Sequence, residues 1–181
     1  MPVQIALLRG INVGGRATVA MSDVRDLFEA AGYAGARTLL QSGNVVFECD
    51  RLTRAALELR LETEMKKRLG LSIDYFVRSG MEWAKVVERN PFPREAKNDP
   101  GHLLVMFFKK APQAKFVSAL RAEVRGPEVI RADGKQLYIV YPAGIGRSKL
   151  SGTVIERKLD QRGTARNWNT VLKLANLCQN R

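Results

Sequence analysis

The chain has 181 residues, of which 45% are hydrophobic, so it can form one folded domain or two small ones and is not disordered. No apolar run approaches the roughly 20 residues of a bilayer-spanning helix, and no signal peptide is evident, so we expect a cytoplasmic protein that does not engage a membrane. The net charge of +12 favours nucleic acid or phosphorylated ligands as partners, and a solvated basic surface without a ligand is the alternative explanation.

In the first half of the chain, hydrophobic periodicity predicts the order strand, helix, strand, strand, helix, strand. An apolar run over residues 3–9 indicates a strand, and Ser22 is the expected N-cap of a helix that ends at Gly32. The remaining expected elements are strands over residues 37–41 and 44–48, a helix over 53–69 and a strand over 72–77.

The second half repeats this order after a proline-rich connection. A helix over residues 79–89 leads to Pro91 and Pro93, and a strand follows at 102–108. The expected elements after it are a helix that opens at Pro112, a hairpin around Asp133-Gly134, a helix near 151–159 and a last helix over 167–178. Only residues 163–165 are available for a final strand.

This order predicts an α+β protein with a duplicated ferredoxin-like architecture, in which two βαββαβ-type units each form an antiparallel sheet. We expect the first unit over residues 1–78, a connecting helix and linker over 79–101, and the second unit with the C-terminal helix over 102–181.

A loop rich in glycine and arginine follows the first strand. It contains Arg9, Asn12, Gly14, Gly15 and Arg16, residue types that bind anions through backbone amides and guanidinium groups. In a βαββαβ sheet the turn between the second and third strands lies at the same sheet end. Ser42 and Asn44 should therefore lie beside this loop and complete a binding site. A flexible strand-to-helix connection without a ligand is the alternative interpretation.

Two further segments contribute candidate anion-binding residues. Gly144, Gly146 and Lys149 precede the helix near 151–159, and a loop of this composition can hold a phosphate group. Arg166 precedes the last helix, for which Asn167 is a plausible N-cap.

Motifs for several familiar chemistries are incomplete. Residues 10–16 resemble a phosphate-binding loop, but Arg16 and Ala17 replace its lysine and hydroxyl residue. His102 is the single histidine, and Cys49 and Cys178 form no CxxC pair, so we expect no metal site and no cofactor. The aromatic pattern of an RNA-recognition motif is also missing.

Four motifs together resemble the domain-of-unknown-function 1697 family of mostly bacterial proteins. They are Leu8-Arg9-Gly10-Ile11-Asn12-Val13-Gly14-Gly15, Gln41-Ser42-Gly43-Asn44-Val45-Val46-Phe47, Asn90-Pro91-Phe92 and Arg166-Asn167-Trp168-Asn169-Thr170-Val171. The resemblance implies two ferredoxin-like subdomains and no established activity, cofactor or catalytic residue.

Three functional hypotheses follow from these observations. The first is a protein that binds a phosphate-bearing small molecule or a nucleic acid through its Gly/Asn/Arg-rich loops. The second is an enzyme that positions a nucleotide or another phosphorylated substrate without a nucleophilic histidine. The third is a structural or interaction module, which predicts that Arg9, Asn12 and Asn44 are buried and hydrogen-bonded within the protein and leave no open cleft. The sequence does not indicate an oligomeric state.

Overall fold

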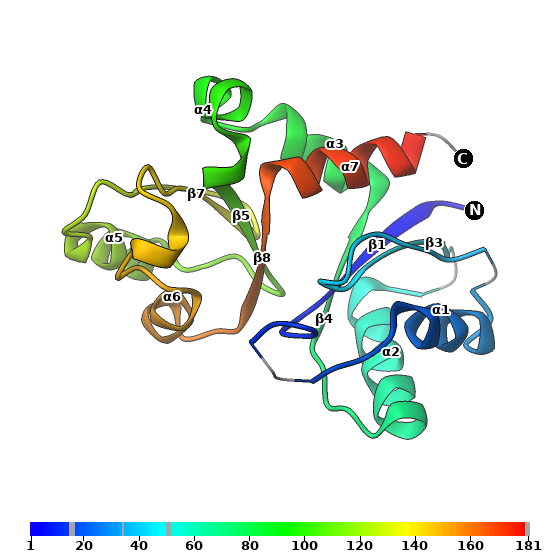
Figure 1. Ribbon diagram of the computed structural model, residues 1–181. Helices are drawn as coiled ribbons and strands as arrows, with labels where there is room; N and C mark the ends of the chain where they lie inside the picture. The colour runs from blue at the N-terminus through cyan, green and yellow to red at the C-terminus, as the bar shows by residue number, and fades with distance from the viewer. Residues whose placement is uncertain (15–16, 34, 50–51, 180–181) are drawn as a thin grey trace. The chain divides into compact units, whose positions relative to one another are not determined.

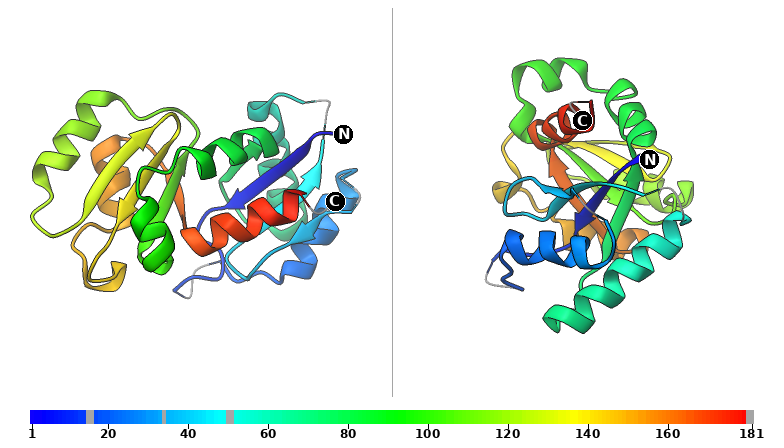
Figure 2. Two further views of the ribbon diagram at one scale, coloured as in Figure 1. Left: turned by 90° about the horizontal axis from the view of Figure 1, so that it is seen from above. Right: turned by 90° about the vertical axis from the view of Figure 1, so that its right-hand side faces the viewer.

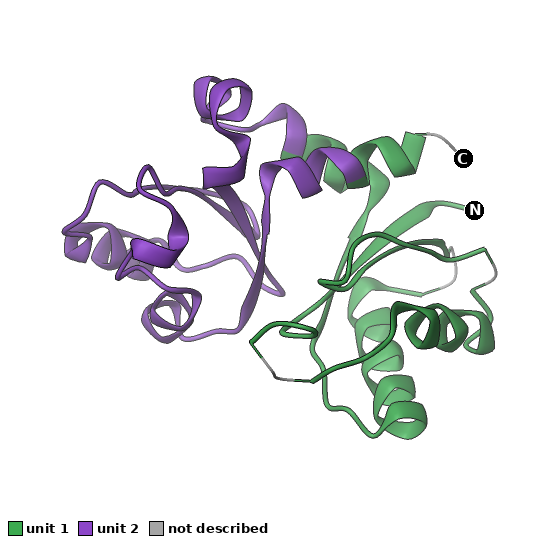
Figure 3. Cartoon of the chain, in the orientation of Figure 1, with its two compact units in different colours: residues 1–86, 174–181 green, residues 87–173 purple. Residues whose placement is uncertain are grey.

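The computed structural model describes residues 1–14, 17–33, 35–49 and 52–179 and contains two four-stranded antiparallel sheets (Figure 1). The first sheet has the order β2-β3-β1-β4, and the second has the order β6-β7-β5-β8. The equivalent strand orders confirm the predicted duplicated α+β architecture. The chain divides into a first unit, residues 1–86 and 174–181, and a second unit, residues 87–173 (Figure 3).

The first unit follows the predicted order of elements closely. Its elements are β1 (Val3–Leu8), α1 (Met21–Ala30), β2 (Arg37–Thr38), β3 (Asn44–Glu48), α2 (Arg54–Leu69), β4 (Tyr75–Ser79) and most of α3 (Gly80–Glu88). Helix α1 begins one residue before Ser22, and its N-cap is Ala20, so the predicted serine cap is wrong. Thr53 caps α2 through its side chain, and Gly70 ends that helix with φ of 70°.

The second unit is built on the same plan. Its elements are α4 (Pro93–Asn98), the 3₁₀ helix η1 (Pro100–His102), β5 (Leu103–Phe108), α5 (Ala114–Glu123), β6 (Val129–Asp133), β7 (Gln136–Val140), the 3₁₀ helix η2 (Ile145–Arg147), α6 (Gly152–Leu159), β8 (Gly163–Asn167) and the start of α7 (Trp168–Gln179). The last strand is longer than the three residues expected from the sequence, because Arg166 and Asn167 also pair with β5.

Two helices cover one face of each sheet. In the first unit α1 and α2 pack side by side, and Phe28 and Leu61 are fully buried against Ala6 and Phe47 of the sheet (Figure 2). In the second unit α5 and α6 contribute the corresponding core against β5 and β7. The side chains of β1 and β5 that point to the other face of each sheet are buried as well. Both faces of each central strand are therefore shielded from water.

Carboxylates protect the outer edge of β4. The backbone amides of Tyr75 and Val77 donate to Glu62 and Glu58 of α2 at 3.0 and 2.9 Å. The Ser79 amide donates to Glu82 of α3 at 2.9 Å. Unpaired amides at a sheet edge invite pairing with other chains, so these three bonds stabilise the edge strand.

The two units share a short motif that spacing alone does not reveal. Arg78 and Arg166 occupy equivalent strand positions, opposite Ile5 and Val105, and each donates to the carbonyl of the preceding residue at 2.8 Å. The next residue caps the following helix, because the Ser79 side chain accepts from the Glu82 amide and the Asn167 side chain accepts from the Thr170 amide. The duplication is therefore visible in residue identity at this junction.

Burial raises the pKa of all four tyrosine phenols, that of Tyr138 to about 12. Because an exposed phenol titrates near pH ~10, the unfolded chain binds fewer protons than the folded protein above that pH, and stability must fall as pH rises. Burial also lowers the pKa of Arg78 and Arg166 to about 10, which opposes this trend. Because four phenols act against two guanidinium groups, the net effect is that stability falls as the pH rises above ~10.

We therefore expect tyrosinate absorbance to stay low as the pH passes 10 and to rise together with the loss of far-UV circular dichroism. The measurement is a spectrophotometric alkaline titration of the native protein, with a urea-unfolded sample as the reference. If all four phenols ionised at about pH 10 while the circular dichroism was unchanged, the tyrosine side chains could not be buried as the structure shows.

Candidate functional site

The loop after β1 and the turn between β2 and β3 lie against each other, as the topology predicts. The Leu8 amide donates to the Gly43 carbonyl at 2.9 Å. The Asn12 side-chain amide donates to the carbonyls of Gln41 and Val19 at 2.8 and 2.9 Å, and its oxygen accepts from the Val19 amide at 2.9 Å. Asn12, with φ of 52°, thus holds both segments together.

The other predicted residues of this region also have partners within the protein. Asn44 is fully buried and donates to the Leu39 carbonyl at 2.7 Å and to the Ser42 hydroxyl at 3.2 Å. Arg9 lies 4.0 Å from a carboxylate oxygen of Asp74. Gly14 is exposed with φ of 60°, and the predicted residues Gly15 and Arg16 lie outside the described residues. The internal contacts agree with the structural hypothesis, but only Asn44 is buried as it predicts, since Arg9 and Asn12 are partly exposed.

Arg166 is buried within β8. Its guanidinium donates to the Thr164 hydroxyl and to the Ala165 carbonyl, both at 2.8 Å. The sequence suggested an arginine on a loop, but strand pairing with Val105 continues through this position and turns the residue into part of the sheet.

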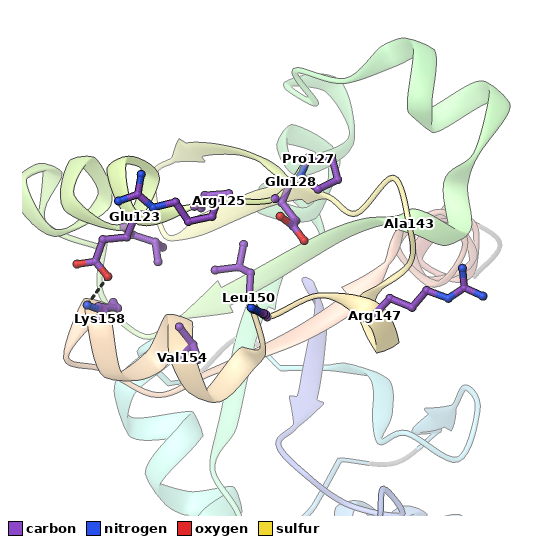
Figure 4. Close-up of a pocket in the computed structure, with 13 residues that line it drawn as sticks. Glu123, Arg125, Pro127, Glu128, Ala143, Arg147, Leu150, Val154 and Lys158 are labelled. Atoms are coloured by element: carbon purple, nitrogen blue, oxygen red, sulfur yellow. Dashed lines mark ion pairs between the residues drawn. The ribbon is translucent and has the colours of Figure 1, made fainter.

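The second unit contains a cavity of about 400 Å³ between the end of α5 and the start of α6 (Figure 4). Its apolar lining includes Leu120, Leu150 and Val154, which also belong to the core of this unit or pack against it. The volume lies within the range of ~300–1,000 Å³ that is typical of small-molecule sites.

Cationic side chains dominate the charge of the cavity lining. Lys158 forms an ion pair with Glu123 at 2.5 Å. Arg125, Arg147 and Lys149 also line the cavity, and none of the three forms an ion pair with a described residue. Figure 4 shows Glu123 and Lys158 at one end of the cavity and Arg147 at the other. The lining therefore combines apolar side chains with an excess of cationic ones.

A network of hydrogen bonds shapes the loop that carries Arg147 and Lys149. The Ser148 hydroxyl donates to the Glu128 carboxylate and accepts from the Leu150 amide. The Tyr141 hydroxyl, whose pKa is raised by burial, donates to the Leu150 carbonyl at 2.9 Å. Gly144, with φ of 83°, lets the chain turn directly after Tyr141.

Among the predicted residues of this loop, Lys149 lines the cavity, whereas Gly144 and Gly146 shape the backbone next to it. The Gly144 amide donates to the Tyr141 carbonyl at 2.8 Å. The amides of Gly146 and Lys149 donate to no acceptor among the described residues. Because Gly146 does not line the cavity, the arrangement leaves the Lys149 amide and three cationic side chains for a ligand there.

The sequence interpretation missed Arg125 and the two carboxylates of the cavity, Glu123 and Glu128. Glu123 is the last residue of a helix of ordinary composition, the other two follow that helix, and no motif marks them. The signal that could have found them is topological, since the loop before β6 and the loop after β7 must meet at one sheet end.

The described part of the chain contains no group of three or more His, Cys, Asp or Glu side chains that could hold a metal ion. Nor does any described helix combine the length and apolar character needed to cross a membrane. His102 pairs with Asp99, with 2.8 Å between its Nδ1 and a carboxylate oxygen, and it lies outside the cavity lining.

A family model described as "Protein of unknown function (DUF1697)" matches residues 1–138. The chain belongs to this family. The cavity combines residues inside the matched segment, such as Arg125, with residues beyond it, such as Lys149.

Comparison with solved structures gives the same fold. The structure of the conserved bacterial protein SP0830 from Streptococcus pneumoniae is similar, with a TM-score of 0.71 and 20% sequence identity over 98% of both chains. No curated protein matches the DUF1697 chain.

Proposed function

We propose that this DUF1697 protein binds a small ligand in which one or two phosphate groups are attached to an apolar or aromatic part, as in a nucleotide. The observation that carries the proposal is the cavity of about 400 Å³ that Arg125, Arg147 and Lys149 line, all three without carboxylate partners among the described residues. Charge-assisted hydrogen bonds to phosphate are stronger than neutral ones. The apolar lining supplies burial for the remainder of the ligand.

The chemistry of the lining favours binding over covalent catalysis. The described lining residues include two carboxylates and two lysines but no Ser, Thr, Tyr, Cys or His side chain, so the hydroxyl, thiol and imidazole nucleophiles of covalent catalysis are missing from them. The glycine-rich loop after β1, which the sequence suggested as the primary site, instead uses Asn12 to hold its own backbone, and Asn44 holds the neighbouring β2–β3 turn. The proposal therefore places the ligand at the Lys149 loop.

Substitution of the cationic residues tests this proposal. We expect Lys149→Ala and Arg147→Ala each to weaken binding of adenosine 5′-monophosphate by about 10-fold or more, because each removes a charge-assisted contact. The measurement is isothermal titration calorimetry with adenosine 5′-monophosphate, adenosine and inorganic phosphate as probes. Adenosine should bind more weakly than its monophosphate, since it lacks the charged group.

Lys97→Ala is the matched control, because Lys97 is an exposed cation of the same unit on α4 and does not line the cavity. An equal loss of affinity in Lys97→Ala would contradict the proposal, as would equal binding of adenosine and its monophosphate. The melting temperature of each variant shows that the fold is intact.

A further inference from the structure

Glu128 is the acidic residue of the cavity lining whose charge has no cationic partner among the described residues. Two carboxylates line the cavity, and Glu123 pairs with Lys158. Glu128 forms no ion pair within the part of the chain that the structure describes, although cations line the same cavity. A carboxylate without a cationic partner repels a phosphate group, so its presence in this lining requires a reason of its own.

Two neighbouring residues fix the position of this carboxylate. The Ser148 hydroxyl donates a hydrogen bond to Glu128 Oε1. Gly126 leaves the space in which the carboxylate lies, because a Cβ atom at position 126 would lie 2.9 Å from Glu128 Cδ and would overlap Oε2. Gly126 does not belong to the glycines with positive φ, so a side chain there would disturb this space and not the backbone conformation.

The fixed carboxylate lies beside the residues that are proposed to hold the phosphate group. Its hydrogen-bond donor, Ser148, stands between Arg147 and Lys149 in the chain. Figure 4 shows the Glu128 carboxylate pointing toward the segment between Arg147 and Leu150. The ribose of a nucleotide separates its phosphate from its base, so the ribose hydroxyls are the hydrogen-bond donors nearest the phosphate. Glu128 is therefore placed to meet the ribose.

The chemistry of the lining leaves Glu128 as the side chain that can accept hydrogen bonds from these hydroxyls. Every polar side chain among the described lining residues is charged, and arginine and lysine only donate. An ionised carboxylate only accepts, with about four lone-pair positions on its two oxygens. The Ser148 hydroxyl uses one position at Oε1, and no described residue donates to Oε2. The carboxylate can thus accept from both ribose hydroxyls.

We propose that Glu128 accepts hydrogen bonds from the ribose hydroxyls of the ligand, so that the cavity selects ribonucleotides over nucleotides that lack these hydroxyls. The inference rests on the proposed function, because it concerns the same cavity. Hydrogen bonds from a hydroxyl to a carboxylate are charge-assisted and offset the repulsion between the carboxylate and the phosphate. A ligand without the hydroxyls meets the repulsion alone. Glu128 is thereby the residue that determines this specificity.

Isothermal titration calorimetry with adenosine 5′-monophosphate and 2′,3′-dideoxyadenosine 5′-monophosphate tests the inference, because the two probes differ only in the ribose hydroxyls. We expect the first to bind about 10-fold or more tightly than the second. Glu128→Gln should remove most of this preference and should tighten binding of the dideoxy nucleotide, since the repulsion is gone. A purely structural role of Glu128 in holding Ser148 would instead weaken binding of both probes.

Two further variants separate the position of the carboxylate from its charge. Gly126→Ala keeps the charge but displaces the carboxylate, so it should also reduce the preference for the ribonucleotide. Glu123→Gln is the matched control, because it removes the same charge from the same lining. It should change the affinity for both probes by the same factor and keep their ratio. Circular dichroism of each variant shows that the fold is intact.

The outcomes distinguish this inference from the proposed function. Equal binding of the two nucleotides by the unaltered protein would overturn the inference and leave the proposed function standing. If neither nucleotide bound, both would be overturned. A preference that persisted in Glu128→Gln, or that was lost to the same extent in Glu123→Gln, would show that another group recognises the hydroxyls and would overturn the inference as well.

Discussion

Gly43→Ala is expected to destabilise the first unit by about 2–5 kcal/mol. Gly43 has φ of 80°, a left-handed conformation in which a side chain costs about 1–2 kcal/mol. A Cβ atom at this position would also lie 2.7 Å from both Ile11 Cδ1 and Leu8 Cβ. Ile11 and Leu8 are fully buried, so relief of this overlap must displace the core.

Gly35→Ala separates the two contributions. Gly35 has φ of 74°, close to that of Gly43, but a Cβ atom there would meet no atom within 4 Å. Its substitution should cost only the conformational part, about 1–2 kcal/mol. The measurement is urea unfolding followed by circular dichroism. Equal destabilisation by the two substitutions would show that the loop after β1 does not pack on the β2–β3 turn.

Glu58→Leu is expected to cost about 3 kcal/mol, because it leaves the buried Val77 amide without its charged acceptor. The carboxylate of Glu58 also favours the charged form of the nearby buried Arg78. Glu58→Gln keeps an acceptor oxygen and should be less destabilising than Glu58→Leu. Urea denaturation of the purified variants measures both effects.

Glu64→Leu is the matched control on the same helix. Glu64 pairs with Arg68 on the exposed face of α2, an i,i+4 contact that the sequence spacing also indicates. It should change stability little. If Glu58→Leu were as mild as Glu64→Leu, the carboxylates at the edge of β4 would not stabilise that strand.

Local sequence signals were sufficient for the elements that depend on short-range chemistry. Thr53 and Gly70 bound α2 as their residue types predict, because capping and left-handed termination are local effects. The approach of the β2–β3 turn to the loop after β1 followed from topology, since antiparallel pairing of β1 with β3 fixes the sheet end.

The candidate site was harder to predict, because side-chain environment is set by tertiary packing. Arg166 and Asn44 have the residue types of ligand-binding groups, yet both are buried with partners inside the protein. Arg125, in contrast, lies in a loop without any motif and reaches the cavity only because two loops meet. Lys149 was found because glycine, hydroxyl and cationic residues cluster in its loop.

The most direct test of the proposed function is a titration of the isotope-labelled protein with adenosine 5′-monophosphate, followed by amide chemical-shift changes. Our account predicts saturable shifts concentrated at Gly146, Lys149 and Arg125, with Asn12 and Asn44 unaffected. Saturable shifts centred on the loop after β1, or no shifts at low-millimolar concentrations of the nucleotide, would contradict it.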